Sequence, residues 1–429
     1  MKLAITNVGP FSGRQEIHLD GITILAGLNG VGKSTFGKVL YCVFSSFYDI
    51  EEKVTHDRER TIRNFIFHSV VNMNYQNRAL VGLFVDNAEQ LWRKLKQISD
   101  NIEDEAENDI TINEFLGELF GADYDPDVGN MIKKQIREVM RISDDKIRAK
   151  MVENYIDAEF GGQIWNINST EKKAEIELSI KDRSISFICG TEGISIKEYM
   201  SLVKSVLYFD DPNVADYLDS SRMSAILDEK SHKSDLLRKL KIKNNQQFSS
   251  VDQILIQEKI KRIEDIINRV CDGDITVTDS RQFSYLSKDF TEGLNIGNMA
   301  TGLKSFAVLK LLLKKGCLEE NGTVIFDEPE IHLHPEWQRI WAEIIVLLHK
   351  ELDLHVLIST HSSDFLGFLE LYVHKYNITD KTNLYQLVKD DQAGSHVVNA
   401  GSDWDIVYRQ LGTPFLRATE ELDEINDES

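Results

Sequence analysis

The stretch GLNGVGKS, residues 27–34, has the residue types and spacing of a loop that binds phosphate groups. It fits the pattern G-x-x-x-x-G-K-[ST] and lies between an apolar run and a predicted helix, where such a loop must lie. Glycines let the backbone turn so tightly that successive N–H groups point at phosphate oxygens, and the helix N-terminus adds positive charge. We expect Lys33 to bridge the β- and γ-phosphates of a nucleotide, Ser34 to bind Mg²⁺ and Thr35 to reach the α-phosphate side. The alternative is a glycine turn that binds no nucleotide.

Two adjacent acids, Asp327 and Glu328, follow an apolar run at residues 323–326 that predicts a buried strand. A Mg²⁺ on a triphosphate needs a carboxylate beside it and an attacking water needs a base, and consecutive residues leaving a strand supply both. We therefore predict that Asp327 lies on the metal side and that Glu328 is the base. Buried acids are costly without partners, and the cation and the water would compensate for that cost. In the alternative interpretation both acids only cap the next helix.

The hydrophobic pattern predicts the elements that position these residues. Near the N-terminus, runs at residues 2–8, 15–19 and 22–26 predict strands, and the third leads directly into the glycine-rich stretch. After residue 290, the chain reads as a helix in TGLKSFAVLKLLLKKG, the buried strand, a helix beginning at Pro335 and an apolar strand in HVLIS. This alternation of helix and strand predicts a parallel α/β sheet.

The middle of the chain has two other patterns. From the glycine-rich stretch to about residue 155 it is mainly helical and charged, which predicts a helical insertion. Alternating runs at 162–168, 174–182 and 184–190 then predict an antiparallel sheet with one solvated face. Residues 250–271 form an amphipathic helix pattern that DG at 272–273 ends.

Composition limits the class of protein. With 429 residues, 42% of them hydrophobic, the chain can bury a large core, and no apolar run is long enough for a membrane span. We expect a cytoplasmic protein without a membrane segment, whose four widely spaced cysteines are reduced. The net charge of -21 repels nucleic acid, so any contact with it needs a local patch. One basic cluster exists, formed by Lys230, Lys233, Arg238, Lys239, Lys241 and Lys243.

Four stretches together carry a family resemblance: GLNGVGKST, TGLKSF, VIFDEPEIHLHP and LISTHSSDF. They resemble the ABC-type ATPase heads of the SMC, RecF and OLD group, and in particular the AAA-labelled ATPase subunits of bacterial anti-phage systems such as Septu. The match covers the first 45 residues or so and about 290–365, and VLYFDDPNVADYL looks like a further segment of these proteins. It implies an α/β ABC-ATPase head, with a mixed sheet that carries the P-loop, an antiparallel β portion and helical insertions.

The resemblance and the patterns together divide the chain into six parts. These are an N-terminal part of the ATPase lobe with Walker A at 1–49, a helical insertion at 50–155, an antiparallel β portion and connector at 156–225, a helical segment at 226–290, a C-terminal part of the lobe with signature, Walker B and switch histidine at 291–415, and an acidic tail at 416–429.

The resemblance also implies site residues for ATP and Mg²⁺. Catalytic roles fall to Lys33, Glu328 and His361, the last as the switch histidine that senses the γ-phosphate. Nucleotide contacts are implied for Gly27, Asn29, Gly30, Val31, Gly32, Lys33, Ser34, Thr35, Thr301 and Gly302. Metal contacts are implied for Ser34, Asp327 and a Q-loop glutamine, for which Gln163 is the candidate.

A head-to-tail homodimer, or a higher homo-oligomer, is implied as well. In it, residues 300–305 close over the nucleotide of the opposite chain, and residues 331–335 form the D-loop that crosses to the second subunit. The chain departs from the family where a serine usually contacts the γ-phosphate, because that position is Ala300. Thr301 or backbone groups would then make the contact, and slow ATP hydrolysis is expected.

Two functions follow from the resemblance. The first is an ATP-driven switch that controls a separately encoded effector, a nuclease or a toxin, in a bacterial anti-phage defence system. About seventy residues follow STHSSD, too few for a TOPRIM nuclease domain, and no heptad pattern predicts the coiled-coil arms of SMC proteins. The alternative is a RecF-like DNA-binding ATPase in repair or plasmid maintenance that uses the basic cluster at 230–243.

Overall fold

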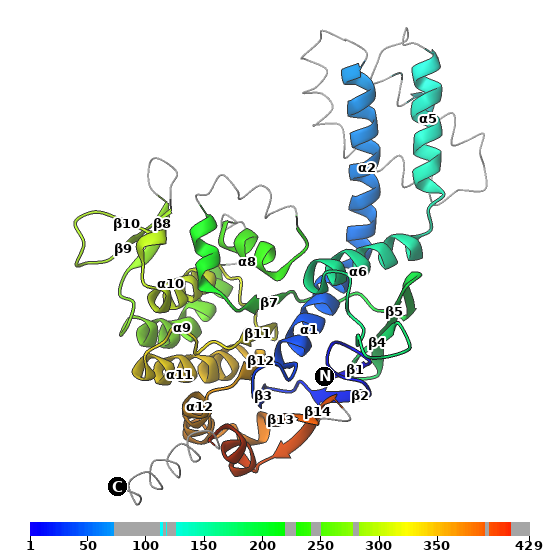
Figure 1. The fold of residues 1–429 in the computed structure, drawn as a ribbon. Helices are drawn as coiled ribbons and strands as arrows, with labels where there is room; N and C mark the ends of the chain where they lie inside the picture. The colour runs from blue at the N-terminus through cyan, green and yellow to red at the C-terminus, as the bar shows by residue number, and fades with distance from the viewer. Residues whose placement is uncertain are drawn as a thin grey trace, which may run out of the picture. The chain divides into compact units, whose positions relative to one another are not determined.

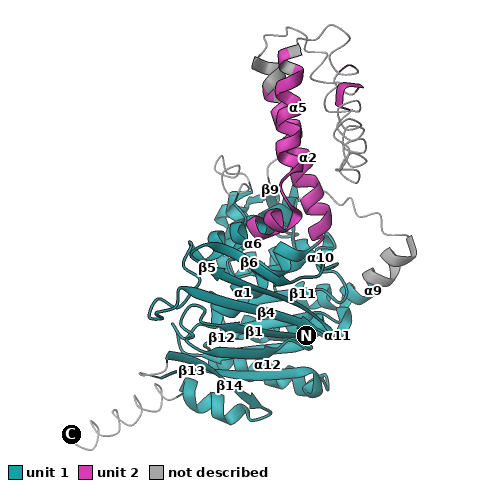
Figure 2. Cartoon of the chain, turned by 90° about the vertical axis from the view of Figure 1, so that its right-hand side faces the viewer, with its two compact units in different colours: residues 1–48, 151–429 teal, residues 49–150 magenta. Residues whose placement is uncertain are grey.

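The computed structural model describes residues 1–72, 112–114, 117, 126–218, 229–241, 250–277, 283–390 and 394–412. The chain divides into two compact units (Figure 2). One consists of residues 1–48 and 151–429, and the other of residues 49–150, which interrupt the first in sequence. The predicted acidic tail at 416–429 lies outside the described residues.

The larger sheet of the first unit contains six strands in the order β14-β13-β3-β12-β11-β7. They are β3 (Ile22–Gly27), β7 (Val206–Phe209), β11 (Thr323–Asp327), β12 (His355–Thr360), β13 (Thr382–Asp390) and β14 (Gly394–Gly401). Neighbouring strands from β13 to β7 are parallel, and β14 is antiparallel to β13 at the edge. Every residue of β3 is buried, as expected for a strand with both faces covered. The carboxyl ends of β3, β7, β11 and β12 therefore meet at one edge of the sheet.

Helices cover both faces of this sheet (Figure 1). They are α1 (Lys33–Phe47), α8 (His232–Lys241), α9 (Ser250–Ile267), α10 (Thr301–Lys314), α11 (Pro335–Leu352) and α12 (Ser363–Lys375). Helix α1 packs on one face, and the other five contribute to a core with the opposite face. Trp341 of α11 lies at the centre of that core, and its ring contacts Phe209, Phe306 and Phe326. The structure confirms that Pro335 begins its helix.

The second sheet is antiparallel, with five strands in the order β2-β1-β4-β5-β6. They are β1 (Lys2–Thr6), β2 (Arg14–His18), β4 (Lys173–Ile180), β5 (Arg183–Gly190) and β6 (Gly193–Glu198). Burial alternates along β4, as predicted for a sheet with one solvated face. The α/β class, with a mixed sheet and an antiparallel portion, is thereby confirmed.

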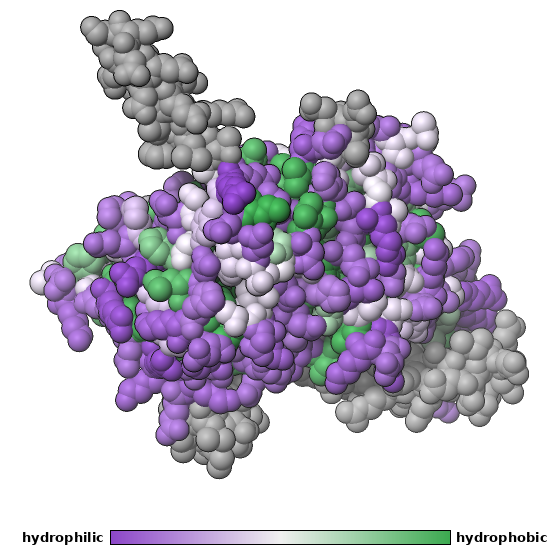
Figure 3. Space-filling model, turned by 90° about the horizontal axis from the view of Figure 1, so that it is seen from below, coloured by the Kyte–Doolittle hydropathy of each residue, from purple (hydrophilic) through white to green (hydrophobic). Residues whose placement is uncertain are grey.

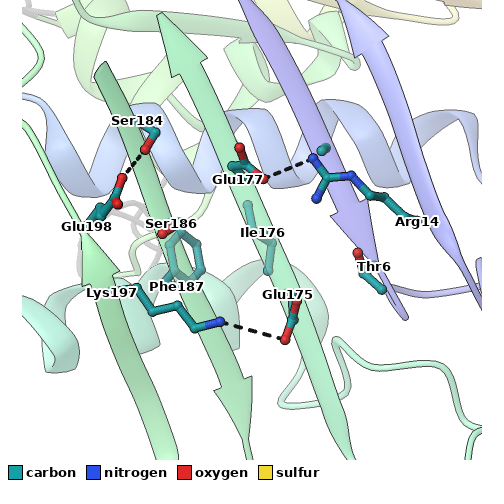
Figure 4. Close-up of a pocket in the computed structure, with 11 residues that line it drawn as sticks. Thr6, Arg14, Glu175, Ile176, Glu177, Ser184, Ser186, Phe187, Lys197 and Glu198 are labelled. Atoms are coloured by element: carbon teal, nitrogen blue, oxygen red, sulfur yellow. Dashed lines mark hydrogen bonds and ion pairs between the residues drawn. The ribbon is translucent and has the colours of Figure 1, made fainter. Parts of the chain in front are cut away.

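A polar cavity of about 300 Å³ lies on this antiparallel sheet (Figure 4). The charged side chains that line it are largely paired with one another: Arg14 with Glu177 at 3.0 Å and Lys197 with Glu175 at 3.9 Å. Ser184 donates a hydrogen bond to Glu198. The charged side chains of this cavity therefore already have partners within the sheet.

Three details differ from the sequence predictions. Residues 162–168 form no strand: Trp165 makes only an isolated bridge to Val8, and positive φ angles at Gly161 and Gly162 turn the chain before it. Strand β7, which lies in the stretch predicted as the antiparallel β portion and connector at 156–225, pairs in the parallel sheet, where all four of its residues are buried.

The third difference concerns the helical segment predicted at 226–290. Besides α8 and α9 it contains β8 (Asp274–Val277) and β9 (Phe283–Leu286), which join β10 (Leu294–Asn295) in a three-stranded antiparallel sheet. Strands of two to four residues are too short to show a period in the sequence.

The second unit is helical where it is described. Helix α2 (Ile50–Asn72) packs along α5 (Pro126–Met140), and α6 (Asp144–Phe160) begins in this unit. Arg148 is buried and forms ion pairs with Glu51 at 2.8 Å and Asp145 at 2.9 Å. Within the described residues of the chain, no helix combines the length and apolar character that a membrane span needs.

The face shown in Figure 3 is mostly hydrophilic, and hydrophobic residues form small separate groups on it. Cys42, Cys189 and Cys271 are buried, Cys317 is partly buried, and all four are free thiols.

Candidate functional site

The glycine-rich loop joins the end of β3 to the start of α1. Gly32 has φ of 102°, and a Cβ there would lie 2.6 Å from Pro10 and 2.7 Å from the ring of Phe11, so only glycine fits. Gly30 has φ of 79°, and a Cβ there would meet no atom within 4 Å. The backbone at Gly30 is therefore open to an approaching group, and Leu28 and Asn29 are exposed beside it.

Asp327, the predicted metal-side acid, ends β11 and contacts the start of α1. Its Oδ1 accepts a hydrogen bond from Ser34 Oγ at 3.1 Å, although the two residues are 293 positions apart. Ser359, at the end of the neighbouring strand β12, also donates to Oδ1. Tyr208 on the other neighbouring strand, β7, donates to Oδ2 at 2.7 Å. Parallel pairing places Ser359 and Tyr208, and the start of α1 places Ser34, so three hydroxyl groups donate to one carboxylate.

The candidate base Glu328 follows in a left-handed conformation, with φ of 50°. Its N–H donates to the carbonyl of Ser359 at 3.0 Å and to the hydroxyl of that residue at 3.1 Å. Successive side chains in a regular strand point to opposite faces, and the left-handed residue breaks this rule. Glu328 Oε1 therefore lies 3.2 Å from Lys33 Nζ, beside the Ser34–Asp327 contact.

Lys33 is almost completely buried, with 4% of its side chain exposed. Its Nζ also donates to the carbonyl of Leu28 at 3.0 Å. A buried ammonium needs a charged partner, and Glu328 is the one that it has in this structure. The ion pair joins the glycine-rich loop to the residue that follows β11.

The predicted switch histidine joins the same group. His361 Nδ1 lies 3.2 Å from Glu328 Oε1, and the histidine side chain as a whole is about one-third exposed. The backbone N–H of His361 donates to Glu330 Oε1 at 3.3 Å, and Thr360 Oγ1 donates to the same oxygen at 2.6 Å. Burial raises the pKa of Glu330. Glu330 thereby ties the loop after β11 to the loop after β12.

Thr301 and Gly302 lie apart from this group, at the start of α10. Thr301 donates to Asn213 Oδ1 at 3.4 Å, and a Cβ at Gly302 would lie 2.9 Å from the carbonyl of His332. Ala300 precedes the helix and gives no side-chain cap, so the first N–H groups of α10 have no side-chain acceptor at that position. Lys304 in the first turn is buried and bonded to Asp216 at 2.6 Å.

Gln163 is exposed in the turn after α6. The carbonyl of the next residue, Ile164, accepts a hydrogen bond from Gly9 N at 2.8 Å. A Cβ at Gly9 would lie 3.2 Å from Thr35, so the chain at Gln163 passes close to the residue that follows Ser34. Its metal role stays a prediction.

The donors present fit Mg²⁺ and a triphosphate. Ser34 Oγ and Asp327 Oδ1 lie 3.1 Å apart, close to the roughly 2.9 Å that separates adjacent oxygens around an octahedral Mg²⁺. Both are oxygen donors, which this hard cation prefers. The open backbone at Gly30 and the end of Lys33 would face the phosphates.

The basic cluster is partly used inside the fold. Lys239 Nζ donates to the carbonyl of Val206 at 2.9 Å and also to Asp235. Arg238 donates to the carbonyl of Glu229 at 3.0 Å and to Ser234 at 2.8 Å. Lys243 lies outside the described residues. Lys233 Nζ also lies 3.8 Å from Asp210, so at least three of the six cations have structural partners that the charge pattern could not reveal.

Sequence reasoning did not identify Tyr208, Ser359, Thr360 and Glu330 as parts of the site. One feature of the sequence could have indicated three of them: Tyr208, Ser359 and Thr360 lie at or near the carboxyl ends of apolar runs. Residues at the ends of strands next to β11 must approach Asp327 in a parallel sheet. Which strands are its neighbours is known only from the fold.

Comparisons with known proteins agree with this geometry at the level of the family. A family model described as an AAA ATPase domain matches residues 1–366. No curated protein matches the chain.

Similar solved structures include the SMC head domain from Thermotoga maritima, with 9% identity, a TM-score of 0.38, and coverage of 93% of this chain and 97% of that one. Another is an SMC head bound to the C-winged helix domain of ScpA, with 12% identity, a TM-score of 0.44, and coverage of 94% and 98%. A third is an SMC head with an extended coiled coil, bound to the C-terminal domain of ScpA derived from Pyrococcus furiosus, with 11% identity, a TM-score of 0.43, and coverage of 99% and 98%. Because the family model spans most of the chain, from the glycine-rich loop to the loop after β12, this protein belongs to the AAA ATPase domain family.

Proposed function

We propose that the protein binds ATP with Mg²⁺ at the glycine-rich loop, hydrolyses it slowly, and uses the bound nucleotide as a switch for a separately encoded effector. One observation carries the ATPase part. Two segments nearly three hundred positions apart meet, with Ser34 3.1 Å from Asp327 and Lys33 3.2 Å from Glu328. A lysine, a hydroxyl and two acids in this arrangement suit the binding and hydrolysis of a triphosphate.

Each residue has a distinct role in the proposed reaction. Lys33 exchanges Glu328 for phosphate oxygens, and the loop N–H groups bind the remaining negative charge. Mg²⁺, when held by Ser34 and Asp327, would neutralise charge on the phosphates. Glu328, once released from Lys33, accepts a proton from the attacking water at Oε1. His361 Nδ1 lies 3.2 Å from that oxygen, beside the proposed base.

The proposed active form is a head-to-tail dimer. The start of α10 offers backbone N–H groups to an anion, and Thr301 lies in its first turn. Thr301 and Gly302 contact neither acid nor Lys33 in the described part of one chain, which supports the proposal that they serve a nucleotide on a second copy. Ala300 supplies no hydroxyl, and this supports slow turnover.

For the effector we propose a nuclease or a toxin of an anti-phage defence system, as the sequence resemblance implies. The alternative, a DNA-binding ATPase, depends on the basic cluster, of which Arg238 and Lys239 are bonded within the fold. DNA binding that weakens with salt, and that is lost in a Lys233→Glu, Lys241→Glu variant, would favour that alternative. Stable association with the product of a neighbouring gene, without DNA affinity, would favour the effector.

A lysine variant tests the ATPase proposal. We expect Lys33→Ala to lose measurable ATP binding in isothermal titration calorimetry, because no other side chain near Ser34 supplies a buried positive charge in the described site. Lys204→Ala is a matched control, since Lys204 forms an ion pair with Glu319 at 3.1 Å away from the loop. If Lys33→Ala binds ATP as tightly as the control, the loop is not the nucleotide site.

A further inference from the structure

The carboxylate of Asp327 is held at both of its oxygens. Oδ1 faces Ser34, the residue with which it would share a metal ion, and Oδ2 accepts the hydroxyl of Tyr208 at 2.7 Å. The terminal torsion of an aspartate side chain is soft, so a carboxylate with one free oxygen rotates over a wide range. A donor fixed on Oδ2 keeps Oδ1 directed at Ser34.

Tyr208 can act as such a donor because its own ring is fixed. Only 2% of it is exposed, and β7 pairs with β11 so that Tyr208 lies beside Ile325, two residues before Asp327. Helix α1 comes close to it at Gly37, where a Cβ would lie 3.2 Å from the tyrosine hydroxyl and 3.1 Å from Ile325. Glycine within α1 therefore leaves the space that the tyrosine hydroxyl needs.

The other side of the Tyr208 ring is held by His232. The two rings have centroids 4.3 Å apart and are tilted by 31°. His232 is itself bonded to Glu159 through Nδ1 at 2.8 Å and to Asp210 through Nε2 at 3.0 Å. A phenol is protonated at neutral pH, so the hydroxyl of Tyr208 can donate to Asp327.

We propose that Tyr208 is a positioning residue that orients Asp327 for metal binding, with Gly37 and His232 fixing its ring. Tyr208 contacts neither nucleotide nor metal in this proposal and acts only through Asp327. The inference rests on the proposed ATPase function. The proposal gives Tyr208, in the segment VLYF, a role beyond those already assigned to the glycine-rich loop and the two acids.

The test separates metal binding from nucleotide binding. Binding of a fluorescent ATP analogue is measured in EDTA and then across a Mg²⁺ titration, for the wild type, Tyr208→Phe and Tyr376→Phe. Tyr376 is the matched control, because its hydroxyl donates to a carboxylate, Glu343 Oε1, at 2.6 Å on α11 and is also buried. Loss of a partner that orients a metal ligand typically costs about tenfold or more in metal affinity.

We therefore expect Tyr208→Phe to need about tenfold more Mg²⁺ for half-maximal binding, with its affinity in EDTA unchanged. Tyr376→Phe should match the wild type in both. A Mg²⁺ requirement of Tyr208→Phe within twofold of the wild type overturns the proposal. If the wild type itself binds no nucleotide, the ATPase function fails instead, which is a different result.

A second variant keeps the test decisive if Tyr208→Phe does not fold. Gly37→Ala retains every hydroxyl but places a methyl group against the hydroxyl of Tyr208. Since alanine favours a helix more than glycine does, helix α1 itself is not weakened. Gly37→Ala should also raise the Mg²⁺ requirement, and a normal requirement in this folded variant would equally refute the role of Tyr208.

Discussion

The substitution Glu328→Gln should tighten ATP binding while it slows hydrolysis. In the structure without nucleotide, Glu328 Oε1 lies 3.2 Å from Lys33 Nζ, so a phosphate must displace this carboxylate to reach the lysine. The same carboxylate then repels the bound phosphates. Glutamine keeps the size of the side chain and removes its charge, so both obstacles to binding are reduced.

The distance sets the scale of the effect. At 3.2 Å the attraction between the two charges is about 5 kcal/mol at an effective dielectric constant of 20 and about 1.3 kcal/mol at that of water. Lys33 is 4% and Glu328 23% exposed, so the true value lies between these limits. Much of it offsets the cost of burying the lysine, and we expect a net gain in ATP affinity of about 1–2 kcal/mol, or roughly 5- to 30-fold. Loss of a general base should lower the hydrolysis rate by a factor of about 10² to 10⁴.

Two assays on one protein preparation measure these effects. Calorimetric titration with ATP and Mg²⁺ gives the affinity, and release of phosphate under saturating ATP gives the rate. Glu177→Gln is the control, because Glu177 forms an ion pair of similar length with Arg14, at 3.0 Å, on the antiparallel sheet. Wild-type hydrolysis by Glu328→Gln would exclude Glu328 as the base. Weaker ATP binding would show that the Lys33–Glu328 ion pair is not what the nucleotide displaces.

Three further predictions concern stability and reactivity. Burial alone would lower the pKa of His232, but hydrogen bonds to Asp210 and Glu159 and the charges of these acids raise its pKa to about 9. Because this pKa exceeds the ordinary value of 6.5, protonated His232 stabilises the folded protein fully below about pH 6.5. This contribution is lost as the pH rises through 9. Denaturant unfolding should therefore show up to about 3 kcal/mol less stability at pH 9.5 than at pH 6.5, a difference that His232→Gln should largely remove. Lys304→Met leaves Asp216 without its buried partner and should lower the free energy of unfolding in urea by about 1–3 kcal/mol, since Asp216 is partly exposed; an unchanged midpoint would contradict the importance of this pair. Burial raises the pKa of all four cysteines, Cys42, Cys189, Cys271 and Cys317. A thiol reagent at pH 8 should therefore modify the native protein slowly, whereas in guanidinium chloride it should modify all four thiols quickly. Rapid labelling of the native protein would show that these side chains are accessible.

Local patterns made the nucleotide loop and the acidic strand end predictable. Glycines at fixed spacing before Lys33, and an apolar run that ends in Asp327, are properties of short segments, and each formed the expected element. That both belong to one site followed from chemistry, since a triphosphate with its metal ion requires a lysine, a hydroxyl and acids together.

The contacts that orient these residues could not be predicted in the same way. Tyr208 reaches Asp327 across 119 positions because β7 is a neighbour of β11, and this depends on the order of strands in the sheet. The charge pattern of residues 230–243 likewise did not predict which groups these cations contact. Lys239 reaches the carbonyl of Val206 only because α8 packs on β7.

The left-handed backbone at Glu328 carries a cost for the whole molecule. A residue with a side chain is strained at φ of 50° by about 1–2 kcal/mol, and glycine or asparagine would relieve much of it. Glu328→Gly should therefore melt at a higher temperature than Glu328→Gln, which lacks the same charge but keeps the strain, unless the added freedom of glycine in the unfolded chain cancels the gain. The catalytic role that we propose for Glu328 would account for an acid kept at a position where it lowers the stability of the fold.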